Sequence, residues 1–367
     1  MKKVSWLYLL LCWLLTLSLG IPGNLNAEEH QLTFTVLTFN IWSGLDYEGT
    51  LKMGEYETGE HRQKRFEILV RKLQQLRPDV ICLQEVNYFP ETARKIARAI
   101  KYQAYGYVGL GGIHVGPIGL PVNLREADVI LVSPDFKVTS LGREQLSGEG
   151  FSTNWITFHF DEINQVMGLR LEKEGVTFDV FNTHLHAGPG LAHPFINPIR
   201  KLWQQQKIGT AQYRVIYDEF QRNQNRRIRE IRNAVNFIQR VSTGEDPIIF
   251  AGDFNMVPNS RENVALTSLG FTDTWKADRF LALPTWDPQT NRNIIQYYTP
   301  PAPDASVLDK VIWEVDIMKV QRIDYIWTLD FENSMTMVEA GLFGTEAQNG
   351  VHPSDHFGYF ATFRMTQ

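Results

Sequence analysis

Asp253 and Asn255 are the residues whose types and spacing point most directly to chemistry. The apolar run 248–250 before them predicts a buried strand, and Gly252 relaxes the backbone at its end. Residues two apart in an extended segment point the same way. The carboxylate could then accept a proton or bind a metal, while the amide could donate to a phosphoryl oxygen without adding charge. The same Asp-x-Asn pattern is also typical of a plain turn.

Similar polar clusters lie at the ends of the other apolar strands, and their repetition favours a site over a series of turns. In chain order they are Asn40, Glu85, Asn182 with His184, Asp324, and Asp355 with His356. Such oxygen ligands suit Mg²⁺, which keeps waters and takes only one or two protein carboxylates. A zinc site would need more His or Cys ligands. The histidines are better suited to acid and base roles, with an aspartate to orient one of them.

The elements that must position these residues alternate between strand and helix, which predicts an α/β sheet. Apolar or alternating segments predict strands at 32–39, 80–83 and 129–132, and a hairpin over 165–181. Helical spacing of apolar residues predicts helices at 62–76, 90–99 and 217–239. The glycine-rich stretch 106–121 predicts a surface loop.

The helix at 217–239 carries five arginines, which allow two interpretations. They are Arg222, Arg226, Arg227, Arg229 and Arg232. They could form a solvated basic face on an amphipathic helix, or one or two of them could face the site. Because they are spread around the circumference, they suit solvation better than the tracking of a nucleic-acid backbone.

Residues 1–27 have the pattern of a secretory signal peptide. Lys2 and Lys3 precede an apolar run of signal-peptide length, and Ala27 offers a small residue for cleavage. An uncleaved membrane anchor is the alternative, although the run is short for a span. We expect a secreted or periplasmic protein with one catalytic domain over 28–367, acting as a monomer. The formal net charge of -5 makes nucleic acid a less favoured partner, since phosphate binding usually requires a basic surface.

With these clusters in order, the chain resembles the endonuclease/exonuclease/phosphatase superfamily, which has the deoxyribonuclease I fold. The matching motifs are Leu37-Thr38-Phe39-Asn40, Leu83-Gln84-Glu85-Val86, Asn182-Thr183-His184, Gly252-Asp253-Phe254-Asn255, Arg322-Ile323-Asp324-Tyr325 and Ser354-Asp355-His356. The resemblance implies a four-layer α/β sandwich, in which two packed mixed sheets are flanked by helices. It also implies cleavage of a phosphoester with Mg²⁺, or with Mn²⁺ as an alternative.

The resemblance also implies a role for each motif residue. Glu85 is the main metal ligand, with Asn40 and Asp355 beside the metal. Asp253 and Asn255 hold the attacking water and the phosphoryl oxygens. His356 is the catalytic histidine and Asp324 orients it; either His356 or Asp253 could be the base.

The remaining implied roles concern the substrate side of the site. His184 contacts phosphate or protonates the leaving oxygen, and Asn182 in the same motif is a substrate contact. We also expect Glu126 or Asp128, which precede the 129–132 strand, to support His184, as a similarly placed carboxylate does in deoxyribonuclease-like members.

Within the superfamily, the segments 184–187 and 256–258 resemble those of neutral sphingomyelinases. This implies a phospholipid substrate such as sphingomyelin, with contact to a membrane surface left open. A choline headgroup would favour an aromatic cage, for which the candidates are Trp42, Trp275, Trp286 and Trp313. The insertion at 187–217 and a long loop at 275–320 would surround the mouth. A secreted deoxyribonuclease, another phosphatase of the superfamily and a catalytically silent binding module are the alternatives.

Overall fold

The first of two large sheets carries the chain's earliest strands. The computed structural model describes residues 31–275, 284–332 and 334–366, so the predicted signal peptide lies outside the described residues. The sheet has six strands in the order β15-β16-β1-β2-β6-β3. Their bounds are β1 Gln31–Asn40, β2 Val80–Val86, β3 Gln103–Leu110, β6 Glu126–Val132, β15 Met335–Phe343 and β16 Gly358–Thr366.

The second sheet also has six strands, in the order β13-β14-β12-β11-β10-β7. Their bounds are β7 Lys137–Gln145, β10 Gln165–Lys173, β11 Val176–His184, β12 Ile248–Asp253, β13 Thr272–Asp273 and β14 Asp324–Leu329. The predicted hairpin is confirmed as β10 and β11, which pair antiparallel from Gln165 to Lys173. β11 and β12 run parallel, so their carboxyl ends meet at one edge.

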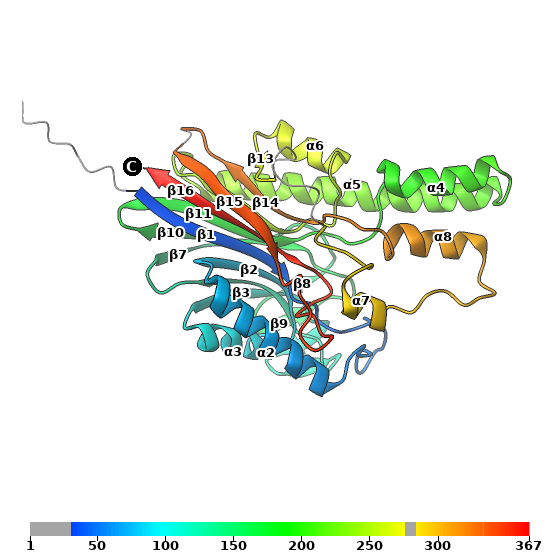
Figure 1. The fold of residues 1–367 in the computed structure, drawn as a ribbon, viewed down its shortest axis with the longest axis horizontal. Helices are drawn as coiled ribbons and strands as arrows, with labels where there is room; N and C mark the ends of the chain where they lie inside the picture. The colour runs from blue at the N-terminus through cyan, green and yellow to red at the C-terminus, as the bar shows by residue number, and fades with distance from the viewer. Residues whose placement is uncertain (1–30, 276–283, 333, 367) are drawn as a thin grey trace, which may run out of the picture.

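The two sheets pack face to face with helices on their outer faces (Figure 1). Helices α2 Gly59–Leu76 and α3 Glu91–Ile100 cover the first sheet through residues such as Leu69 and Ile96. Helices α5 Thr210–Val241 and α6 Arg261–Ser268 cover the second, to which α5 contributes Ile231 and Ile238. Between the sheets lies an apolar core in which the rings of Phe34 and Phe178 stack with centroids 4.2 Å apart. The predicted four-layer α/β sandwich is therefore confirmed.

The segments predicted as loops contain more regular structure than expected. The glycine-rich stretch is not a loop, because β3 ends within it and two short strands, β4 Ile113–Val115 and β5 Ile118–Leu120, follow. β4 pairs with β5 and with β9 Ile156–Phe158, which pairs in turn with β8 Phe151–Ser152, in a separate sheet ordered β5-β4-β9-β8. Six glycines within residues 106–121 obscured the strand pattern, since a residue without a side chain gives no apolar periodicity.

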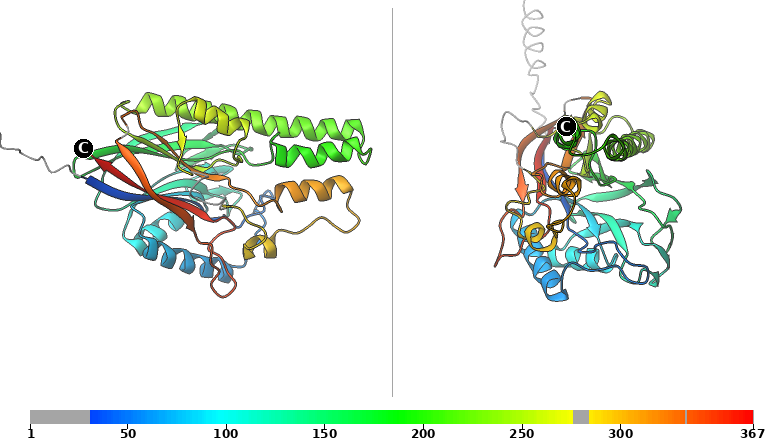
Figure 2. Two further views of the ribbon diagram at one scale, coloured as in Figure 1. Left: turned by 45° about the horizontal axis from the view of Figure 1, so that its top comes forward. Right: turned by 90° about the vertical axis from the view of Figure 1, so that its right-hand side faces the viewer.

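The two segments expected around the mouth both contain helices. The 187–217 insertion contains α4 His193–Gln204 and the first turns of α5, and 275–320 contains α7 Arg292–Tyr297 and α8 Val307–Asp316. Together α4, the start of α5 and α8 form an arm that extends beyond the sheets, on the side toward which β1 runs (Figures 1 and 2). Their apolar faces pack on one another through residues such as Phe195, Phe220 and Val315. No described helix has both the length and the apolar character needed to cross a bilayer.

Candidate active site

Strand register alone brings three predicted side chains together at the edge of the second sheet. His184 on β11 pairs with Asp253 on β12, and Asp253 pairs in turn with Asp324 on β14. Gly252 permits this close pairing, because its φ is +154° and a Cβ there would lie 2.0 Å from the Thr183 carbonyl oxygen. The carboxyl ends of strands are where α/β folds commonly present chemistry.

The first sheet contributes Asn40 and Glu85 from the ends of β1 and β2. Asn40 Nδ2 donates to Glu85 Oε1 at 2.8 Å and to Asp253 Oδ2 at 3.1 Å, so one amide joins the two sheets at the site. Its Oδ1 accepts the Trp42 N–H at 3.0 Å. Glu85 has a φ of 56°, a conformation that costs free energy for a residue with a side chain and tends to occur at functional sites.

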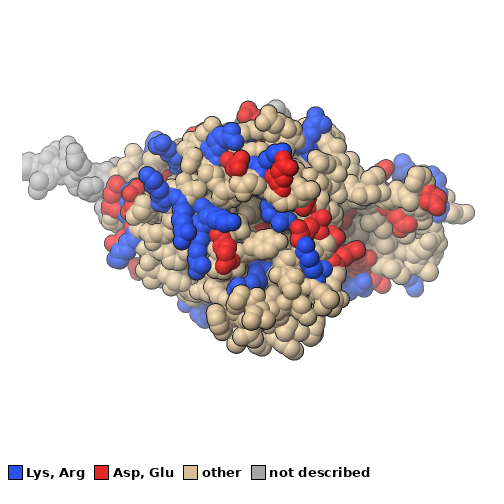
Figure 3. All heavy atoms as spheres, turned by 90° about the horizontal axis from the view of Figure 1, so that it is seen from below, with Lys and Arg blue, Asp and Glu red and all other residues tan. Residues whose placement is uncertain are grey.

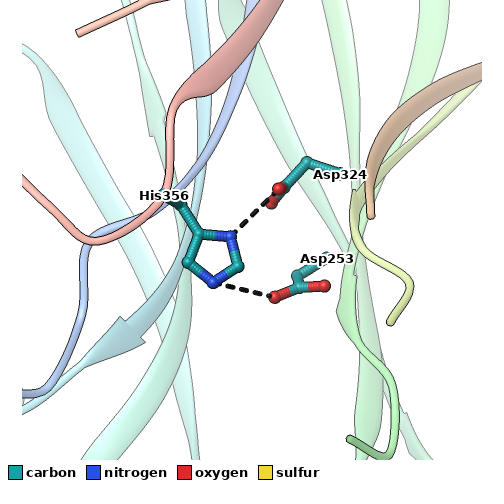
Figure 4. Close-up of side chains that lie close together, drawn as sticks. All are labelled: Asp253, Asp324 and His356. Atoms are coloured by element: carbon teal, nitrogen blue, oxygen red, sulfur yellow. Dashed lines mark hydrogen bonds and ion pairs between the residues drawn. The ribbon is translucent and has the colours of Figure 1, made fainter. Parts of the chain in front are cut away.

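His356 lies between two aspartates, as Figure 4 shows. Its Nδ1–H donates to Asp324 Oδ2 at 3.0 Å, and its Nε2 lies 3.8 Å from Asp253 Oδ2. Burial alone would lower the pKa of His356, but the carboxylates of Asp324 and Asp253 outweigh it and help raise the pKa to about 10. In this arrangement the imidazole is held in one orientation and keeps its proton at neutral pH.

His184 approaches the same aspartate from the other side, with Nε2 3.6 Å from Asp253 Oδ2. Burial would lower the pKa of His184, but nearby carboxylates, led by Asp253 and Glu85, raise it to about 9. Burial, aided by Asp324, raises the pKa of Asp253 to about 6, while both histidines act in the opposite direction. Oδ2 of Asp253 therefore lies close to the Nε2 atoms of both imidazoles.

Asn255 is placed by its backbone and side chain together. Its N–H donates to Asp253 Oδ1 at 3.0 Å, its Nδ2 donates to the Leu185 carbonyl at 2.9 Å, and its φ is 48°. The amide lines the same cavity as Asp253 and His184. Its Nδ2 keeps one further N–H, and the contact with a substrate oxygen stays a prediction.

Asn182 is the one predicted site residue that the structure places elsewhere. It lies two residues deeper in β11 than His184 and is fully buried. Its Nδ2 donates to the carbonyls of Leu83 and Val129 in the opposite sheet, and its Oδ1 accepts from Gln84. The predicted substrate contact of Asn182 is therefore wrong, because all of its polar atoms are used to join the two sheets.

Neither Glu126 nor Asp128 makes a hydrogen bond or ion pair with His184. Glu126 accepts from the Tyr47 hydroxyl at 2.7 Å, and burial, aided by Glu85, raises its pKa to about 8. Asp128 lies close enough to His184 for their charges to interact. The expected support of His184 is thus electrostatic at most, since the charges of both Glu126 and Asp128 interact with His184 through space.

Several contacts that hold the site together could not be predicted from the sequence. Tyr298 donates to Asp355 Oδ2 at 2.7 Å, and Ser354 Oγ donates to the Asn40 carbonyl at 2.7 Å. Arg65 on α2 is buried against Glu57 and donates to the carbonyls of Ile41 and Pro353. These contacts fix the segments that follow Asn40 and precede Asp355, but they join residues far apart in the chain.

The site lies in a cavity of about 540 Å³ at the edge where the two sheets meet. Seven acidic side chains line it, and none of the described residues that line it is Lys or Arg. They are Glu85, Glu126, Asp161, Glu162, Asp253, Asp316 and Asp355, of which Glu126 is largely protonated at neutral pH because its pKa is raised to about 8. Of the four tryptophans considered for a cage, Trp42 and Trp286 line the cavity, together with Tyr298 and Phe160.

A divalent cation fits beside Glu85. Its Oε1 accepts from Asn40 and its Oε2 accepts the Ser43 N–H at 2.9 Å, and each carboxylate oxygen keeps a further lone pair. A second group, Asp253, Asp324 and His356, has ligand atoms within 4.8 Å of one another. A cation there would displace the His356–Asp324 hydrogen bond, so the donors favour Glu85, with Asn40 and Asp355 beside it.

Two arginines of α5 are not part of a solvated face but hold the walls of the cavity. Arg227 is buried, donates to Glu262 Oε1 from Nε and Nη2 at 3.0 Å each, and donates to the carbonyls of His186 and Gly188. Arg226 donates to Glu230 Oε1 and to the Glu162 carbonyl. The interpretation as a solvated basic face is therefore wrong for these two side chains. They position the segments after His184 and around Glu162.

We expect Arg227→Met to destabilise the fold. The substitution keeps much of the side-chain volume but leaves Glu262 as a buried carboxylate without its charged partner, which costs roughly 3–5 kcal/mol. Urea unfolding measures the change. Arg229→Met is the control, because Arg229 is exposed and a surface substitution should change stability by less than about 0.5 kcal/mol. Equal stability of the two variants would contradict the assigned role of Arg227.

Comparison with solved structures relates this fold to known proteins, at identities low enough that only the fold is shared. Truncated TDP2 of Caenorhabditis elegans is 17% identical with a TM-score of 0.55, covering 90% of this chain and 97% of that one. The human Nocturnin catalytic domain with bound sulfate is 17% identical with a TM-score of 0.54, covering 93% and 98%. A mannosyl-6-phosphatase of Bacteroides thetaiotaomicron is 15% identical with a TM-score of 0.54, covering 90% and 99%.

No curated protein matches the sequence directly. The sequence profile of the Endonuclease/Exonuclease/phosphatase family, however, matches residues 37–356. The match extends from the start of the Asn40 motif to His356, so it contains all the strand-end clusters that meet at the cavity. This chain belongs to the endonuclease/exonuclease/phosphatase family.

Proposed function

We propose that this chain is a phosphodiesterase that cleaves a choline phospholipid, such as sphingomyelin, by attack of water on phosphorus. Its family consists of phosphoesterases that generally depend on a divalent metal. The observation that supports the finer assignment is the lining of the cavity, which combines seven acidic side chains with aromatic walls and includes no Lys or Arg among its described residues.

A cationic headgroup matches this lining. Carboxylates attract a quaternary ammonium, and an aromatic side chain such as Trp286 adds cation–π attraction, whereas the Arg65 guanidinium already lies 4.6 Å from the centre of the Trp42 ring. The phosphate of the same headgroup would meet the positively charged His184 and His356. A DNA strand would instead bring several phosphates toward carboxylates, whereas DNA-binding surfaces rely on Lys and Arg at the phosphates.

Three residues of the chain have separate roles in the proposed reaction. Asp253 Oδ2, which lies 3.6 Å from His184 Nε2 and 3.8 Å from His356 Nε2, is placed to hold the attacking water and accept its proton. His356, kept charged by Asp324, stabilises negative charge on the phosphoryl oxygens. His184 donates a proton to the leaving oxygen.

The metal completes this arrangement. Glu85, with Asn40 and Asp355 beside it, would hold Mg²⁺ or Mn²⁺, which supplies further positive charge at the phosphoryl group. Removing that charge should abolish activity, because positioned charge provides much of the catalysis of phosphoryl transfer. We also propose export of the chain on the basis of residues 1–27, with the mature protein acting outside the cytoplasm.

A substrate panel tests the assignment. Sphingomyelin micelles, lysophosphatidylcholine, a sugar monophosphate and plasmid DNA are assayed with Mg²⁺ and again after chelation with EDTA. We expect release of phosphocholine from the choline lipids, with loss of the activity in EDTA. Release of inorganic phosphate from the sugar monophosphate alone would indicate a monoesterase and reject the proposal.

A further inference from the structure

The small sheet β5-β4-β9-β8 presents apolar side chains to solvent and polar side chains to the protein. Ile113 pairs directly with Leu120 on β5 and with Phe158 on β9, so all three side chains share one face, and all three are exposed. The intervening residues His114 and Thr157 are buried. A sheet with one face in water normally shows the reverse alternation.

The polar contacts of the inner face fix this orientation. Buried His159 Nε2 accepts the N–H groups of Gly111 and Gly112 at 2.9 and 3.1 Å, and its Nδ1–H donates to the Asp161 carbonyl. Ser152 Oγ donates to the Val108 carbonyl at 2.6 Å. Turning the sheet over would break these hydrogen bonds, so the exposure of the apolar face is specified by the sequence.

The exposed face is large and uncharged. Residues 108–124 and 150–160, which we call the apolar lobe, contain no Asp, Glu, Lys or Arg. Ile118 is 80%, Trp155 65% and Phe160 84% exposed. Figure 3, which views the molecule from below, shows such an uncharged region at its lower edge. Contiguous exposed apolar surface on a soluble domain commonly marks an interaction site.

The lobe is continuous with the cavity. Leu110, Leu124 and Phe160 belong to the lobe and also line the cavity, and Phe160 is followed directly by Asp161 and Glu162 of the cavity wall. A surface bound by the lobe would therefore lie next to the cavity mouth.

We propose that the apolar lobe docks on the surface of a zwitterionic phospholipid bilayer and inserts Ile118, Trp155 and Phe160 among the headgroups. This deepens the proposed function and rests on it, because the docked bilayer would present its headgroups to the cavity. The chemistry of the lobe favours this partner. An anionic membrane would be matched by Lys and Arg, which the lobe lacks, whereas aromatic and aliphatic side chains favour the interface of an uncharged bilayer.

Flotation with vesicles of phosphatidylcholine and sphingomyelin tests the docking. His356→Ala is used as the background so that the lipid remains intact. Ile118→Lys and Trp155→Ser are compared with Val264→Lys, a control on α6 that is 59% exposed and lies outside the lobe. In the wild-type background, each variant is also assayed on water-soluble p-nitrophenyl phosphocholine.

We expect the two lobe variants to lower vesicle binding by roughly tenfold each, while Val264→Lys binds as the background does and all three hydrolyse the soluble ester normally. Equal vesicle binding by all variants would overturn the docking proposal. So would a dimer that Ile118→Lys converts to monomer without a change in vesicle binding, because the lobe would then be a contact between copies. Normal flotation of a protein that cleaves no choline ester would reject the proposed function and leave the docking intact.

Discussion

His356→Ala should lower kcat by roughly 10³–10⁴-fold, since it removes a charged imidazole at the phosphoryl group together with its hydrogen bond to Asp324. Removal of His356 also leaves the buried Asp324 carboxylate without its hydrogen-bond partner, so we expect the variant to be less stable than wild type, and it is assayed at a temperature where it is folded. Steady-state kinetics on sphingomyelin micelles, with circular dichroism to verify folding, measures the effect.

His193→Ala is the matched control for this loss. His193 is exposed at the first residue of α4 and makes no hydrogen bond or ion pair among the described residues. Its replacement should leave kcat and KM unchanged. A folded His356→Ala variant with a kcat within a few-fold of wild type would remove His356 from the reaction.

Glu85→Gln should cause the second large loss. The amide keeps the shape of the side chain and one acceptor oxygen, but it removes the negative charge that a hard divalent cation requires. We expect activity at ordinary Mg²⁺ to fall by roughly 10²–10⁴-fold. Titration with Mn²⁺, followed by its paramagnetic effect on water relaxation, should show weaker metal binding by the same variant.

Glu91→Gln is the control for the loss of one negative charge from the protein. Glu91 is exposed at the first residue of α3, so its replacement changes the net charge equally without touching the cavity. Near-wild-type turnover by Glu85→Gln, with unchanged Mn²⁺ affinity, would move the metal away from Glu85.

The sequence was sufficient to predict which strands meet at the site and most of the residues that face it. Polar residues such as Glu85 and Asp253 stand out because they end runs that are otherwise apolar. Parallel strands end at one edge, so the meeting of His184 with Asp253 followed from the topology. The alternation of strands with amphipathic helices such as α2 predicted an α/β sheet, and the four layers followed from the resemblance to the family.

The depth of a residue within its strand and the partners of its side chain could not be predicted in the same way. Asn182 has the same side-chain direction as His184, and a period of two does not show which of the two reaches the edge. Arg227 looked like any surface arginine of an amphipathic helix, because its partner Glu262 lies on another helix. Tyr298, which binds Asp355, belongs to a segment without strand or helix periodicity.

The apolar lobe was missed for a related physical reason. Its strands are two or three residues long, so they provide too few positions for an alternation to emerge. Their alternation is also inverted relative to an ordinary half-exposed sheet, with His114 inside and Ile113 outside. Only the three-dimensional arrangement shows that these segments form one face beside the cavity.

Hydrolysis of sphingomyelin in ¹⁸O-enriched water, followed by ³¹P NMR and mass spectrometry of both products, tests the central claim most directly. If water activated in this cavity attacks phosphorus, a new O–P bond forms and the P–O bond to the ceramide breaks. We predict one ¹⁸O atom in phosphocholine and none in ceramide. Label in the ceramide, or efficient nicking of plasmid DNA without any release of phosphocholine, would contradict the account.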